Sequence, residues 1–151
     1  MSYASRMPAC PLCESSGAEI VWEDGLCRVI RVGGADGEAF PGYCRVVWRN
    51  HVAEMTDLDA GSRRHLMNVV LAVEMALRTL LSPDKINLAS LGNMVPHLHW
   101  HVIPRWRDDS HFPAAIWAAA TTTTSLHRPG PTNETLRSAI TSALAEEESG
   151  A

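Results

Sequence analysis

The sequence has no excess of positive charge. Its 13 Lys and Arg residues are outnumbered by 17 Asp and Glu residues, which gives a formal net charge of −4 at pH 7. Proteins that bind nucleic acid over a broad surface usually present a basic face. We therefore expect no nucleic-acid partner, and any recognition of phosphate must depend on a few local residues.

The sequence also lacks a long apolar run. Residues 1–13 contain no apolar core of the kind that a signal peptide needs. The most apolar stretch, residues 69–81, is interrupted by Glu74 and Arg78 and is therefore too polar to cross a membrane. We expect a cytoplasmic protein with no membrane partner.

Cysteine is scarce, with four residues in the chain, and a reducing compartment disfavours disulfides. Cys10 and Cys13 form a Cys-x-x-Cys turn, which predicts a metal pair or a redox pair. Cys27 and Cys44 lie in β-rich segments and are expected to be small buried hydrophobic residues.

No internal repeat is apparent, and 151 residues suit a single domain around one core. We expect five strands, at residues 19–22, 27–32, 43–49, 86–91 and 97–104. Apolar residues at spacings of three and four predict one long helix, which Thr56 or Asp57 caps and Ser82-Pro83 ends. The glycine-rich residues 33–37 are expected to form a loop.

The composition changes after residues 1–117, which we expect to form the main domain. Residues 118–132 are of low complexity and predict a linker. Residues 133–151 predict a C-terminal helical tail, with Leu136 and Ile140 on a narrow apolar stripe. This stripe could dock on the body of the protein or on a partner subunit.

Three histidines, His97, His99 and His101, alternate with apolar residues. Because side chains on a strand alternate between faces, the three imidazoles are expected on one face, while Leu98 and the other apolar residues face the core. Packing alone gives little reason for such a row, because buried ring nitrogens need partners. The row predicts either a metal site or a site that binds and attacks a phosphate group.

Residues 95–105, Val-Pro-His-Leu-His-Trp-His-Val-Ile-Pro-Arg, resemble the motif of the histidine-triad (HIT) family. Residues 41–52 are similar to the family's Pro-Gly-His-x-x-Val-x-Pro-x-x-His-Val strand. The resemblance implies an α+β fold: an antiparallel five-stranded sheet with one long helix and a short C-terminal helix. It also implies a homodimer, and it assigns the HIT-like domain to residues 1–117.

The resemblance implies a nucleotide hydrolase or nucleotidyl transferase. His99 would attack the α-phosphate of a purine nucleotide and form a covalent nucleotidyl-histidine, and His101 would contact the phosphate or the leaving atom. The family's galactose-1-phosphate uridylyltransferases carry Gln at this last position, so His101 favours hydrolysis. Implied substrates are dinucleoside polyphosphates, nucleoside phosphoramidates and adenylylated small molecules. Asn93 is implied as a catalytic phosphate contact, and Asn87 and Asp36 as nucleotide-binding residues.

Cys10, Cys13, His51 and His97 form a second set. Thiolates and imidazoles are the donors that zinc prefers in tetrahedral structural sites. Some HIT proteins have such a pair near the N-terminus and use the first triad histidine as the fourth ligand. The resemblance thus implies a structural zinc ion that holds the start of the chain against the sheet.

Two rival interpretations stay open. The triad histidines could hold a catalytic metal, with Asp108 or Asp109 as a general base. Alternatively, the protein could be a zinc-stabilised nucleotide-binding module without turnover. Downstream of the triad, Arg105 either contacts phosphate or lies at the surface, and Trp117 either stacks on a base or packs at an interface.

Overall fold

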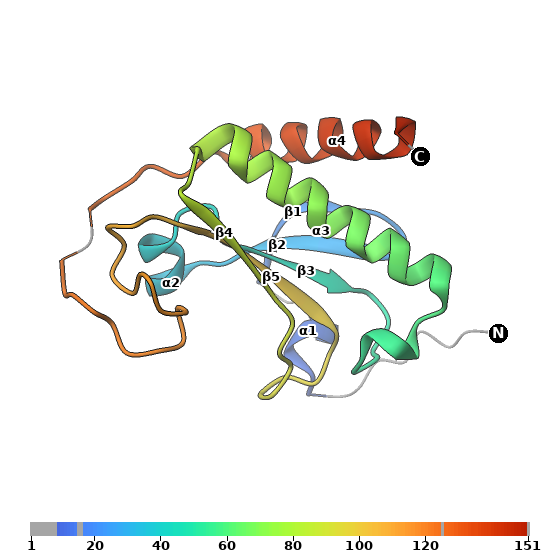
Figure 1. Cartoon of the computed structure of the whole chain (residues 1–151). Helices are drawn as coiled ribbons and strands as arrows, with labels where there is room; N and C mark the ends of the chain where they lie inside the picture. The colour runs from blue at the N-terminus through green and yellow to red at the C-terminus, as the bar shows by residue number, and fades with distance from the viewer. Residues whose placement is uncertain (1–8, 15–16, 125, 151) are drawn as a thin grey trace.

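The computed structural model describes residues 9–14, 17–124 and 126–150. The remaining residues, which include the start of the expected domain, Ser125 of the expected linker and the last residue of the tail, lie outside that description. Five strands form one antiparallel sheet in the order β1-β2-β3-β5-β4, which confirms the expected α+β architecture (Figure 1). The strands are β1 (Glu19–Glu23), β2 (Cys27–Arg31), β3 (Cys44–Trp48), β4 (Lys85–Ala89) and β5 (His99–Arg105).

The long helix α3 (Ala60–Leu81) is the main cover of one sheet face (Figure 1). Its N-cap is Asp59, whose side chain accepts a hydrogen bond from the Ser62 amide. The expected cap at Thr56 or Asp57 is wrong, because those residues form a separate 3-10 turn, η1 (Met55–Asp57), before the helix begins. The predicted end at Ser82 is confirmed: this residue adopts a left-handed conformation and caps the helix.

The two faces of the sheet bury different clusters. Alternate strand residues such as Val29, Val46 and Val102 pack with the apolar side of α3 in the main core. On the opposite face, one small cluster joins Ile30 and Val47 of the sheet to helix α1 (Pro11–Glu14). A second cluster on that face consists of Phe40, Tyr43, Ile103 and Ile116. His99 and His101 of β5 lie on this face between the two clusters, since His99 pairs with Val47 of the first and Ile103 of the second lies two residues beyond His101.

The loop expected at residues 33–37 is wrong, because this segment begins helix α2 (Gly34–Ala39). Backbone hydrogen bonds from Gly37 to Gly33 and from Phe40 to Asp36 close its turns. The chain then passes close under the end of α3 at Gly42, where φ is +91° and an added Cβ would lie 2.8 Å from a Leu81 methyl carbon. Glycine at this position lets β3 start directly beneath the helix.

The C-terminal helix α4 (Asn133–Ser149) is longer than the short helix expected, and it packs beside α3 (Figure 1). Leu136 and Ile140 are fully buried in the main core, so the apolar stripe docks on the body of the same chain. Arg137 also donates a hydrogen bond of 2.6 Å to the Val21 carbonyl, at the irregular edge strand β1.

The division of the chain into domain, linker and tail stays a prediction. None of the helices within the described residues combines the length and the apolar character needed to cross a bilayer.

Candidate active site and metal centre

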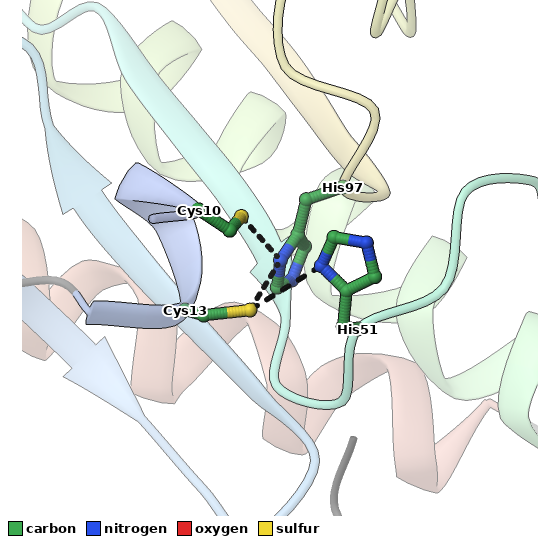
Figure 2. A group of neighbouring side chains, drawn as sticks. All are labelled: Cys10, Cys13, His51 and His97. Atoms are coloured by element: carbon green, nitrogen blue, oxygen red, sulfur yellow. Dashed lines mark hydrogen bonds between the residues drawn. The ribbon is translucent and has the colours of Figure 1, made fainter. Parts of the chain in front are cut away.

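Cys10, Cys13, His51 and His97 converge from three separate parts of the chain (Figure 2). One ligand atom from each lies within 4.8 Å of all the others. The Cys10 sulfur lies 3.5 Å from Nδ1 of His97, and the Cys13 sulfur lies 3.4 Å from the same nitrogen. The Cys13 sulfur is also 3.3 Å from Nδ1 of His51.

These distances can be compared with a tetrahedral zinc site. With Zn–S bonds of about 2.3 Å and Zn–N bonds of about 2.0–2.1 Å, neighbouring sulfur and nitrogen ligands lie about 3.5 Å apart. The observed separations of 3.3 to 3.5 Å match this edge length. Two thiols and two imidazoles at this spacing therefore fit a structural zinc ion.

His97 is prepared to be a ligand through Nδ1. Its Nε2 lies 2.6 Å from the Trp48 carbonyl oxygen, which can only accept a hydrogen bond, so Nε2 carries the proton and the Nδ1 lone pair faces the thiols. Burial lowers the pKa of His97, and the hydrogen bond to Trp48 opposes that effect only in part. The ring is therefore neutral at pH 7, as a metal ligand must be.

The Cys-x-x-Cys segment, in which Cys10 directly precedes helix α1 and Cys13 lies within it, is held on the sheet by a buried arginine. The Arg28 side chain on β2 donates a hydrogen bond to the Leu12 carbonyl, between the two cysteines. A backbone hydrogen bond from Cys13 to Cys10 closes the Cys-x-x-Cys turn. The thiols are therefore placed by the fold of the chain as well as by any metal ion.

His99 has the opposite ring arrangement. Its Nδ1 lies 2.5 Å from the His97 carbonyl oxygen, so Nδ1 carries the proton and neutral His99 has its lone pair on Nε2. Among the residues that the structure describes, no group forms a hydrogen bond with that Nε2. Burial lowers the pKa of His99, the hydrogen bond to His97 opposes this, and the charge of Arg45 lowers the pKa further.

His101 lies beside His99, with ring centroids 4.9 Å apart. Its Nδ1 is 2.6 Å from the hydroxyl of Tyr43, a residue with 1% exposure. Burial, then the charges of His99 and Arg45, lower the pKa of His101 to about 4. His101 is therefore neutral at pH 7.

The alternation expected for residues 97–104 is largely observed. Leu98 and Val102 lie in the main core, and Trp100 packs against it. The strand itself begins at His99, however, two residues later than predicted. Within the described parts of the chain, His99 and His101 are not members of any cluster of ligand atoms close enough to share a metal ion. This geometry disfavours the interpretation in which all three triad histidines bind one catalytic metal.

Within the described residues, none of the other predicted nucleotide-binding residues forms a hydrogen bond with a triad side chain. Asn93 is exposed in the loop before His97, and Asp36 is exposed on α2. Besides burial, the negative charge of Asp36 also raises the pKa of Tyr43, as the smallest of the effects on that group. Asn87 accepts a hydrogen bond of 2.8 Å from Arg105.

Arg105 and Trp117, for which two roles were open, differ in their surroundings. Arg105 is 2% exposed and forms an ion pair of 2.7 Å with Asp109, so its role is internal and it is not a surface phosphate ligand. Trp117 is 49% exposed and lies edge-on to His101, with ring centroids 4.9 Å apart. An aromatic ring is therefore available next to the triad.

Sequence reasoning missed Tyr43 and Arg45 as site residues. Arg45 is directly opposite His101 in the β3–β5 register, and Val47 is opposite His99, so these side chains share one face. Burial raises the pKa of Tyr43, and the charge and hydrogen bond of Arg45 oppose the rise. The available signal was a charged residue in the middle of an otherwise apolar strand.

Comparison with known proteins agrees with this fold. The HIT domain family model matches residues 15–108. An uncharacterized HIT-like protein from Saccharolobus solfataricus is 28% identical over 74 residues, which cover 46% of this chain and 53% of that protein. The match thus spans about half the length of this curated relative.

Two solved structures show the same fold over most of the chain. A histidine triad protein from Bradyrhizobium japonicum has 28% sequence identity and a TM-score of 0.61, and the match covers 85% of this chain and 89% of that one. A Zn-bound histidine triad family protein from Mycobacterium smegmatis has 21% identity and a TM-score of 0.58, with coverage of 95% and 98%. Because the family model matches more than half of the chain and includes the triad, this protein belongs to the HIT family.

Proposed function

We propose that this protein is a nucleotide hydrolase or nucleotidyl transferase that acts at the α-phosphate of a purine nucleotide through a covalent intermediate on His99. The observation that carries this proposal is the hydrogen bond from His99 Nδ1 to the His97 carbonyl. It fixes the tautomer whose Nε2 lone pair is free to attack phosphorus. The retained His101 favours water as the acceptor.

The reaction then has two displacements. In the first, Nε2 of His99 forms a bond to phosphorus while the bond to the leaving group breaks, and the leaving group keeps the electron pair. In the second, a water oxygen forms a bond to phosphorus, the N–P bond breaks, and the water gives up a proton. The products are a nucleoside monophosphate and the leaving group, and the enzyme is restored.

Tyr43 and His101 support the phosphate in this mechanism. Because the pKa of Tyr43 is raised, mainly by burial, its hydroxyl keeps its proton at pH 7 and can donate to Nδ1 of His101, 2.6 Å away. The remaining proton of neutral His101 is then on Nε2. From there it donates a hydrogen bond to a phosphoryl oxygen, whose negative charge grows in the transition state.

We further propose that Cys10, Cys13, His51 and His97 hold a structural zinc ion. The tetrahedral spacing of the donors and the Zn-bound relative from Mycobacterium smegmatis support this assignment. Bound zinc would supply a crosslink between α1 and the segment that leads into β5. The protein's own contacts at Trp48 and Leu12 orient the ligands before any ion binds.

The remaining contacts with substrate are proposed from position. Trp117 offers a half-exposed ring beside His101, which supports stacking on a purine base. Asn93 is proposed to contact phosphate from the loop before the triad, and Asp36 to contact ribose from α2. The contact between Asn87 and Arg105 leaves the side-chain nitrogen of Asn87 for its proposed nucleotide contact. The homodimer also stays a prediction, which light scattering of the purified chain tests.

The test of the proposed function is a panel of nucleotide substrates assayed with the wild type and with His99→Ala. The variant should lose nearly all turnover and still bind nucleotide, because it removes the nucleophile and few ground-state contacts. His65→Ala is a matched control, since His65 lies on α3 and bonds Asp24 away from the site. Turnover by His99→Ala close to the wild-type rate would contradict the proposal, and so would a wild type that turns over no nucleotide.

A further inference from the structure

Arg45 lies beside the triad and has no role in the two displacements described above. We propose that Arg45 binds the phosphate group that departs when His99 attacks, so that the preferred substrates are nucleoside polyphosphates rather than nucleoside phosphoramidates. This inference rests on the proposed function, because it needs His99 as the attacking group. The leaving group is then a phosphate group rather than an amine.

The sheet register places Arg45 beside the triad. Arg45 on β3 is the direct partner of His101 on β5, and directly opposed strand residues have Cβ atoms about 4.5–5.5 Å apart. The centre of its guanidinium lies 5.8 Å from the Tyr43 ring centroid, next to the hydroxyl that bonds His101. Its positive charge lowers the pKa values of both His99 and His101, after the larger effect of burial. The positive charge of Arg45 therefore lies close to the place where the phosphate groups of a bound substrate would lie.

Arg45 has no anionic partner within the described residues. The buried arginine Arg105 forms an ion pair with Asp109, whereas no carboxylate oxygen of the described chain lies within 4.0 Å of the Arg45 guanidinium. Its guanidinium interacts with the Tyr43 hydroxyl, which carries no charge, and its buried Nε has no hydrogen-bond partner there. A partly desolvated guanidinium without a counter-charge is costly, and a phosphate group supplies both the charge and the acceptors.

The chemistry of departure favours phosphate next to such a cation. When the bridging P–O bond breaks, the electron pair stays on the bridging oxygen, and the departing phosphate gains negative charge that Arg45 stabilises. When a P–N bond breaks instead, the nitrogen must gain a proton to leave as an amine. A fixed positive charge beside that nitrogen opposes this proton transfer. Arg45 therefore distinguishes the two leaving groups.

The test compares two substrates that carry the same nucleoside and differ in the leaving group: a dinucleoside polyphosphate and a nucleoside phosphoramidate. The measured quantity is the ratio of their kcat/KM values, polyphosphate over phosphoramidate. We expect the wild type to prefer the polyphosphate and Arg45→Gln to lower the ratio by about tenfold or more. Arg45→Lys should restore part of it, because lysine keeps the charge and loses the planar fork. Arg64→Gln, at an exposed position on α3, should leave the ratio unchanged.

Thermal melting and zinc content show whether each variant is folded. If Arg45→Gln does not fold, Arg45→Lys and the preference of the wild type still decide the question. A ratio that falls by less than about threefold, or a wild type that prefers the phosphoramidate, overturns the inference. His99→Ala separates the two proposals. If His99→Ala kept its activity on both substrates, the covalent mechanism would fail and the inference with it. If His99→Ala lost its activity while Arg45→Gln left the ratio unchanged, the inference alone would fail.

Discussion

His97 and His99 are two residues apart and carry their ring protons on opposite nitrogens. His97 donates from Nε2 to the Trp48 carbonyl, and His99 donates from Nδ1 to the carbonyl of His97 itself. The first arrangement leaves Nδ1 facing two thiols, and the second leaves Nε2 for a substrate. Two backbone carbonyls thus divide neighbouring histidines between the proposed metal centre and the proposed reaction site.

The first prediction concerns zinc. The purified protein should contain about one zinc ion per chain, and Cys13→Ser should lose both the zinc and thermal stability, because binding free energy of a structural ion is folding free energy. Elemental analysis and thermal melting measure the two effects. Cys44→Ala is the control: Cys44 is fully buried on β3 away from the cluster, so this variant should keep its zinc. Full stability without metal would rule out the site.

The second prediction concerns the division of work within the triad. His101→Ala should keep its zinc and slow turnover by very roughly a hundredfold, because it removes a hydrogen bond to the phosphate but leaves the nucleophile. His97→Ala should lose zinc and stability as well as rate. Metal analysis, melting and kcat of the two variants separate these outcomes. Equal loss of one essential metal in both would mean that the triad binds a catalytic metal.

The third prediction is the pH dependence of kcat/KM, which reports groups of the free enzyme. Only neutral His99 can attack, and its pKa is lowered from 6.5, first by burial. As the pH falls, activity should therefore persist through pH 6.5 and decline only below it. A dinucleoside polyphosphate should be used, because a terminal phosphate would itself titrate near pH 6. An acidic limb centred at or above pH 6.5 would show that the ring is not desolvated as described.

The fourth prediction concerns the buried ion pair of Arg105 and Asp109. Burial raises the pKa of Asp109, but hydrogen bonds from Arg105 and from backbone amides outweigh it and lower the pKa below 3.8. The carboxylate's contribution to stability is therefore present above pH 3.8 and is lost as the pH falls through the lower folded value.

Asp109→Asn at pH 7 should lower the free energy of unfolding by about 3–5 kcal/mol, because it leaves Arg105 buried without its counter-charge. Urea denaturation measures this change. Asp108→Asn is a closely matched control: the neighbouring ion pair of Asp108 with Arg128 is half exposed, and its loss should cost no more than about 1 kcal/mol. Equal losses of unfolding free energy in the two variants would contradict the difference that we expect between a buried and a half-exposed ion pair.

The sequence predicted those features that periodicity and motif spacing determine. The five strands, the helix that ends at Ser82 and the buried positions of Cys27 and Cys44 all follow from local patterns. The meeting of the Cys-x-x-Cys turn with His51 and His97 was predicted through the family resemblance.

Other features depend on contacts that a sequence does not reveal. The pairing of Arg45 with His101 depends on strand register, and the burial of Arg105 depends on Asp109 folding back four residues later. Helix α2 forms despite two glycines in its first turn, and a backbone hydrogen bond from Val32 to the Tyr43 carbonyl joins the chain on its two sides, a contact that local propensity does not reveal.

The central claim is that His99 forms a covalent bond to the nucleotide. Its most direct measurement is mass spectrometry of the enzyme after rapid acid-free quenching during turnover, followed by proteolysis and mapping of any adduct. We expect one nucleotidyl group, on the peptide that contains His99, and no such adduct in His99→Ala. An adduct on another residue, or normal turnover of His99→Ala without any adduct, would contradict it.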